Sequence, residues 1–254
     1  LYFTRKYRNR RRIILTEFPA EWIEILEKHV PFYSLIDDND KYIFRKKIQL
    51  FLGGVRITGV NMEIDDITRV LVASGAVIPV FKVLDWEYSM VTDVFVCPDN
   101  FSKYFPFKYS NTNIEGLTVK NKSAVYLTKE SLFRGFSKTE GNNTGIHEFI
   151  HKIDEESGDV DGILPPLFLS KKERSMWLKI IDDEMVRLKK SDSLLHPYAL
   201  TNRAEFIAVA AEFFFERPLE MKERHPKLYR FMKKLFKQNF SSKLEEEIIC
   251  LFKQ

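Results

Sequence analysis

A chain of 254 residues, of which 44% are hydrophobic and 14% aromatic, is long enough to bury a substantial core, which excludes a disordered or collagen-like protein. The formal net charge is +4, but six of the positive charges lie in RKYRNRRR at 5–12, and removing them leaves −2 for the rest. Because phosphate binding needs many clustered Lys and Arg, this balance argues against a broad nucleic-acid-binding face.

The first predicted unit is a basic arm over 1–13, with three interpretations: a solvated terminal run, a cytoplasmic juxtamembrane segment, or an arm that binds nucleic acid. The chain begins with LYF and no methionine, so a membrane anchor upstream of Leu1 is one expectation; the sequence itself contains no span of the ~20 apolar residues that cross a bilayer. Cys97 and Cys250 match no disulfide framework, which is typical of a reducing compartment. We therefore expect a cytoplasmic protein, free or tethered to the cytoplasmic face of a membrane.

The rest, 14–254, reads as a single domain that begins with a helical lobe over 14–85. Pro19 opens a helix over 18–29, Asp37 to Asp40 cap a second over 39–51, and a third begins near Asp65 and continues into an apolar segment at about 70–83.

The catalytic portion is expected over 86–240, followed by a packed tail helix over 241–254. Runs rich in Val, Phe, Tyr and Thr predict strands at 92–97 and 124–128. Apolar periodicity predicts four helices, at 143–155, 171–190, 202–216 and 223–238. These elements predict a mostly helical α+β fold.

The predicted helix 143–155 contains HEFIH, in which His147 and His151 are four residues apart and lie one above the other on the same face. An H-E-x-x-H pattern supplies two nitrogen ligands for zinc and a carboxylate, Glu148, that can take a proton from a bound water. The alternative is a helix with two ordinary hydrogen-bonded histidines. Asp154 either orients a ligand imidazole or caps the following loop, and the loop is favoured.

A third ligand is expected from the helix 202–216, which is apolar nearly all round and therefore buried. Glu205 and Glu212 are seven residues apart and share a face. Zinc would satisfy one carboxylate and an imidazole N–H the other, unless one or both reach water at the helix edge. His196 and His225 each precede a proline at a junction between loop and helix, and we expect both on the surface.

The stretches HEFIHKID, DGILPPL at 161–167 and YALTNRAEFIAVAAEFFFERP at 198–218 resemble the Mlc titration factor A family of bacterial zinc metallopeptidases, whose metal site is similar to that of the catalytic domain of anthrax lethal factor. The resemblance covers most of 14–235. It implies that His147, His151 and Glu205 bind Zn²⁺. It also implies that Glu148 is the general base and that the phenol of Tyr198 stabilises the oxyanion.

The resemblance further implies a zincin-like fold with a small antiparallel or mixed sheet, and hydrolysis of peptide bonds in a peptide or protein substrate, with aminopeptidase-like activity. Its gluzincin-type site would consist of HExxH and a downstream Glu. The strand AVYLT at 124–128 would then be either an edge strand that pairs with the substrate backbone or an ordinary internal strand. The alternative function is a regulatory protein that sequesters a transcriptional repressor and needs no catalysis.

Overall fold

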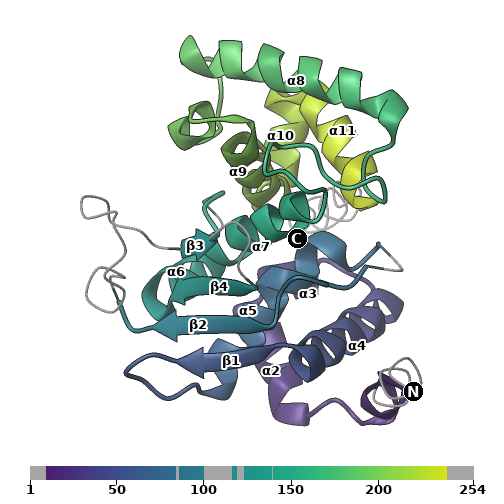
Figure 1. Cartoon of the computed structure of the whole chain (residues 1–254), viewed down its shortest axis with the longest axis vertical. Helices are drawn as coiled ribbons and strands as arrows, with labels where there is room; N and C mark the ends of the chain where they lie inside the picture. Colours follow the sequence, from purple (N-terminus) through teal and green to yellow (C-terminus); the bar gives the residue numbers. More distant parts are fainter. Residues whose placement is uncertain (1–9, 84–85, 100–115, 119–122, 139, 239–254) are drawn as a thin grey trace, which may run out of the picture.

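The computed structural model describes residues 10–83, 86–99, 116–118, 123–138 and 140–238 (Figure 1). Most of the basic arm and the tail 241–254 lie outside these ranges. The fold is α+β and mostly helical, as the sequence predicts. Its elements are α2 (Ala20–His29), α3 (Pro31–Ser34), α4 (Asp38–Gly54), β1 (Arg56–Gly59), α5 (Asp66–Val77), η1 (Ile78–Val80), β2 (Asp93–Cys97), β3 (Gly116–Thr118), β4 (Ala124–Thr128), α6 (Lys129–Ser137), α7 (Thr144–Glu155), α8 (Lys171–Lys189), η3 (Pro197–Leu200), α9 (Arg203–Glu216), α10 (Pro218–Arg224) and α11 (Pro226–Phe236).

Side-chain caps start the early helices where the sequence predicts. The Asp37 carboxylate accepts the backbone N–H of Asp40 at the start of α4 (2.9 Å), and Asp65 does the same for Thr68 at the start of α5 (2.7 Å). Every residue of α5 from 70 to 77 is buried. This helix therefore runs through the core, and its one polar residue between 70 and 77, Ser74, donates its hydroxyl to the carbonyl of Val70 (2.8 Å).

The sheet has the strand order β1-β2-β4-β3. Strands β1, β2 and β4 are parallel, whereas β3 is antiparallel to β4, with Leu117 opposite Tyr126. The sheet is therefore mixed, which is one of the two expected arrangements, and it is not purely antiparallel. The edge-strand interpretation of AVYLT is wrong, because β4 has a partner on each side and all five of its residues are buried. The edge next to α7 is β3.

Helix α7 lies in the middle of the molecule, between the sheet and α5 on one side and α9 on the other (Figure 1). Four of its apolar side chains, Ile146, Phe149, Ile150 and Ile153, are at most 1% exposed and belong to the hydrophobic core. This packing on both sides fixes the position of α7 and of the polar side chains that it carries.

The C-terminal helices correct two predictions. The expected helix 223–238 corresponds to α11, but it begins later than predicted: residues 223 and 224 belong to the end of α10, and Pro226 starts α11. His225, expected on the surface, is fully buried. Its Nδ1 lies 2.7 Å from a carboxylate oxygen of Glu184, and its Nε2 accepts the N–H of Leu194 at 3.2 Å.

Within the described residues, no helix is both long enough and apolar enough to span a membrane.

Candidate metal centre

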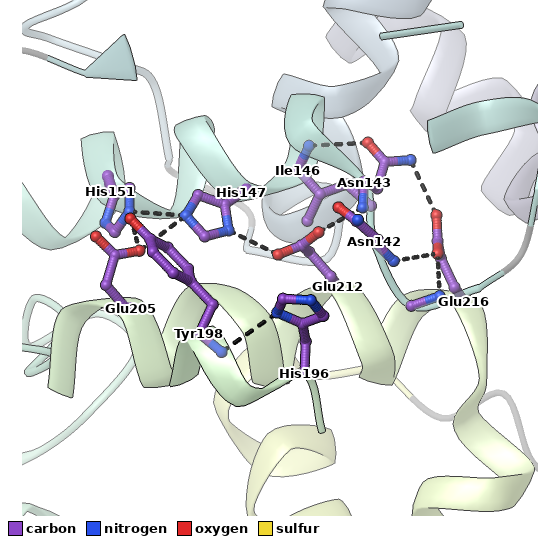
Figure 2. A network of polar contacts seen from close by, with 11 residues as sticks. Asn142, Asn143, Ile146, His147, His151, His196, Tyr198, Glu205, Glu212 and Glu216 are labelled. Carbon is purple, nitrogen blue, oxygen red and sulfur yellow. Dashed lines mark hydrogen bonds and ion pairs between the residues drawn. The ribbon is translucent and has the colours of Figure 1, made fainter. Parts of the chain in front are cut away.

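Two imidazoles of α7 converge on one point. The side chain of Asn143 caps the helix by accepting the N–H of Ile146 (3.1 Å). Because His147 and His151 are four residues apart on this helix, they lie in consecutive turns. Their ring centroids are 4.7 Å apart, and their Nε2 atoms are separated by 3.1 Å. Both nitrogens therefore face the same small volume (Figure 2).

Helix α9 brings a carboxylate to the same volume. Asn202 caps this helix by accepting the N–H of Glu205 at 2.9 Å. The Oε2 atom of Glu205 lies 3.0 Å from His147 Nε2 and 3.2 Å from His151 Nε2. Ligand atoms that share a tetrahedral zinc lie about 3.3 Å apart, from Zn–N and Zn–O bonds of about 2.0–2.2 Å. Two imidazole nitrogens and a carboxylate oxygen at this spacing fit zinc in both chemistry and size.

The carboxylate of Glu212 contacts the imidazole of His147 on the side opposite its Nε2 atom. Its Oε1 lies 2.6 Å from His147 Nδ1, and its Oε2 accepts the backbone N–H of Asn143. Because Nδ1 is occupied by this carboxylate, the Nε2 atom of His147 is the one turned toward Glu205. Glu212 is 3% exposed, so no water-exposed edge accounts for it.

The charges of the cluster are strongly coupled. Burial alone would lower the pKa of His147, but the carboxylates of Glu212 and Glu205 raise it well above its ordinary value. Burial alone would raise the pKa of Glu205, but hydrogen bonds from His147 and His151 hold it well below the usual range. Glu205 is therefore ionised at neutral pH, which is the form that binds a cation.

Glu148 and Tyr198 lie beside the three converging groups. Glu148, on α7, is 5% exposed. Tyr198, in η3, is 49% exposed, and its ring centroid lies 6.1 Å from that of His147. Burial raises the pKa of Tyr198, and the charges of Glu205 and Glu148 raise it further. His196 is exposed, as expected, and its Nδ1 accepts the N–H of Tyr198 at 3.2 Å.

Asp154 is anchored to the loop that follows α7. Its Oδ2 accepts the N–H of Gly162 (2.8 Å), which is the loop-capping role that the sequence favours. Within the described residues, its Oδ1 and the Nδ1 of His151 are both buried without a hydrogen-bond partner. Burial raises the pKa of Asp154 to about 7. The same loop packs against the start of α9. A Cβ atom built on Gly162 would lie only 2.5 Å from the carbonyl oxygen of Arg203, so the backbones of the loop and of α9 are in close contact there.

Sequence reasoning missed one carboxylate of the network, Glu216. Its Oε2 accepts the N–H groups of Gly141 (2.7 Å) and Asn142 (3.1 Å), and its Oε1 accepts Nδ2 of Asn143 (3.1 Å) (Figure 2). Burial raises the pKa of Glu216 to about 8. The available signal was its spacing of four residues from Glu212, which places both on one face of a buried helix.

Comparison with known proteins connects this geometry to a family. A family model described as glucose-regulated metallo-peptidase M90 matches residues 4–237, most of the chain.

Three relatives illustrate the similarity. The uncharacterized protein slr2042 of Synechocystis sp. is 25% identical over 237 residues, which cover 86% of this chain and 84% of that protein. Mlc titration factor A of Serratia proteamaculans is 25% identical over 63% of this chain and 62% of its own length. Its counterpart in Pectobacterium atrosepticum is 33% identical over 41% of this chain and 42% of its own length. The resemblance to Mlc titration factor A indicated by the sequence motifs is thus confirmed.

Proposed function

The chain belongs to the glucose-regulated metallo-peptidase M90 family, and we propose that it is a zinc-dependent peptidase of the zincin-like, gluzincin type, with His147, His151 and Glu205 as metal ligands. The observation that carries this proposal is the approach of Glu205 Oε2 to both imidazole Nε2 atoms, at 3.0 and 3.2 Å. These atoms come from helices α7 and α9, whose ligand residues are more than fifty positions apart in the sequence.

The chemistry follows from the donor set. His147, His151 and Glu205 would hold the zinc, which would act as a Lewis acid toward the scissile carbonyl and toward a water molecule. Glu148 takes the proton from the attacking water and delivers it to the leaving amine. The Tyr198 hydroxyl donates a hydrogen bond to the oxyanion, for which its half-exposed position at the site is suited.

Two buried carboxylates orient the ligands in this proposal. Glu212 keeps the Nδ1 proton of His147 directed away from the metal. Asp154 Oδ1 and His151 Nδ1 are both buried without a hydrogen-bond partner among the described residues, so a bond between them, formed when the metal is bound, would satisfy both atoms. The matching pair of orphaned polar atoms supports this second role, in addition to the loop contact of Asp154.

The substrate backbone, in our proposal, pairs with β3. Among the described strands β3 pairs only with β4, so its other side offers backbone groups to an extended peptide beside α7. Because such pairing uses only the main chain of the substrate, it is compatible with many substrate side chains. Aminopeptidase-like activity on small peptides belongs to the same proposal and rests on the family resemblance alone.

The deciding experiment compares the wild-type protein with Glu148→Gln. Zinc content is measured by elemental analysis, and hydrolysis with a peptide library that varies the N-terminal residues. We expect equal zinc in both proteins and a loss of hydrolysis of at least ~10²–10⁴-fold in the variant, as for removal of a positioned base. Glu63→Gln, at an exposed position, is the matched control. Equal hydrolysis by Glu148→Gln and wild type would refute the peptidase proposal.

A second candidate function is sequestration of a transcriptional repressor, which the name Mlc titration factor A supports for the relatives. The same variant separates the two functions, because binding needs neither Glu148 nor Tyr198. A Glu148→Gln protein that binds the repressor as tightly as wild type would show that this role is independent of catalysis.

A further inference from the structure

Gly116, in the edge strand β3, lies directly against the side chain of Glu148. A Cβ atom built on Gly116 would be 2.6 Å from Glu148 Oε1 and 2.7 Å from Glu148 Cγ. It would also be 2.5 Å from the Cγ2 methyl of Thr144, one turn earlier on α7. The two distances to carbon atoms are far shorter than the ~3.5–4.0 Å of ordinary contact between carbon atoms, and the distance to Oε1 is also too short for ordinary contact. The backbone of β3 thus lies between the side chains of Thr144 and Glu148, and any side chain at residue 116 would displace one of them or the strand.

Helix α7 is packed too closely on its other side to move away from a side chain at residue 116. Thr144 and Glu148 are 7% and 5% exposed, so both are enclosed. On another side of α7, Gly145 lies so close to Gly75 of α5 that a Cβ on Gly75 would be 2.9 Å from the Gly145 carbonyl carbon. A methyl group on residue 116 must therefore displace either the Glu148 side chain or strand β3.

We propose that Gly116 is a positioning residue for the general base: its lack of a side chain lets β3 pack on α7 and leaves the Glu148 carboxylate its place beside His147 and His151. This inference rests on the proposed peptidase function. Moving the carboxylate, or the strand to which the substrate pairs, changes the distance between base and scissile carbonyl. Misplacement by about 1 Å costs on the order of 10²-fold in rate.

The test is Gly116→Ala, with Gly54→Ala as the matched control, because no atom lies within 4 Å of a Cβ built on Gly54 at the end of α4. We expect Gly116→Ala to keep its zinc and to lose roughly 10²-fold in kcat, with KM within about threefold of wild type. Gly54→Ala should match the wild type. A wild-type kcat for Gly116→Ala would overturn the proposal, whereas an inactive wild-type protein would instead refute the peptidase function.

A second variant tests the proposal even if Gly116→Ala does not fold. Thr144→Ser removes the Cγ2 methyl that residue 116 would meet, so the double variant Gly116→Ala/Thr144→Ser keeps only the conflict with Glu148. It should fold and show the same loss of kcat. A folded double variant with the kcat of Thr144→Ser alone would contradict the proposal.

A binding measurement without turnover tests whether the effect passes through Glu148. A peptide hydroxamate binds zinc and gives a proton to the base, so its Kd reports the position of the carboxylate. Wild type, Gly116→Ala, Glu148→Gln and the corresponding double variant form a cycle. We expect Gly116→Ala to weaken binding in the wild-type background and to change Kd by less than about twofold once Glu148 is Gln. Equal losses in both backgrounds would assign Gly116 a purely structural role.

Discussion

Replacing Glu212 by glutamine tests how His147, a proposed metal ligand, is oriented. Both oxygens of this carboxylate accept N–H groups, one from His147 Nδ1 at 2.6 Å and one from the backbone of Asn143. Glutamine has the same shape but only one acceptor oxygen, so one of the two N–H groups must face its NH₂ group. The amide also carries no charge to increase the basicity of the imidazole.

The expected magnitude follows from the buried position of Glu212. Loss of a hydrogen-bond partner of a metal ligand typically costs 10–100-fold in metal affinity. This corresponds to about 1.4–2.7 kcal/mol. Because Glu212 is only 3% exposed, water cannot replace the lost acceptor, and we expect a loss toward the upper end of that range.

The assay is a zinc competition titration against a chromogenic chelator at fixed pH. Glu223→Gln, at an exposed position on α10, controls for the removal of one negative charge. Circular dichroism of the zinc-loaded proteins checks that both variants are folded. A zinc affinity of Glu212→Gln within about twofold of that of Glu223→Gln would refute the orienting role, because the typical loss for such a partner is at least tenfold.

Three other predictions concern neighbouring groups. Tyr198→Phe should lower kcat by roughly 10²-fold with little change in KM or zinc content, because the hydroxyl acts in the transition state; a wild-type kcat would leave Tyr198 a packing role only. Burial raises the pKa of Glu216 to about 8, above its unfolded value of about 4.3, so the stability that this group contributes is complete below pH ~4 and is lost as the pH rises through 8. In urea unfolding at pH 5.5 and 8, Glu216→Gln should therefore lose less stability between the two pH values than wild type, and an equal loss would contradict this. Chelation of zinc should lower the melting temperature reversibly, since a ligand at 100 times its Kd stabilises by about 2.7 kcal/mol; a melting temperature unaffected by chelator and by added zinc would argue against a bound metal.

The converging groups were predictable because their signals are local. Spacings of four residues on α7 and seven on α9 place side chains on one helical face, whatever the rest of the chain does. The sequence also indicated the burial of Glu212 and the partial burial of Glu205, since the helix around them is apolar on nearly every side. The choice between these two carboxylates as the group facing both Nε2 atoms came only from the family resemblance.

The missed features depend on contacts distant in sequence. Strand β3 has three residues and no alternating pattern, and its place is set by pairing with β4 and packing on α7. The five apolar residues of β4 suit an edge or an internal strand equally until its neighbours are known. His225 resembles a surface histidine before proline, but Glu184, 41 positions earlier, provides its buried partner.

The three glutamates of α9 fix the position of this helix against α7, in addition to the role of Glu205 as a proposed metal ligand. Glu205 faces both imidazoles, Glu212 holds His147 from behind, and Glu216 binds the loop that leads into α7. Their spacings of seven and four residues keep all three on one face, so α9 contacts α7 and the residues just before it at three points in a fixed register. A slip of one helical turn, about 5.4 Å, would break all three contacts together. Substitution of Glu216 is therefore expected to weaken zinc binding indirectly, through the register of the two helices, although its carboxylate contacts neither histidine.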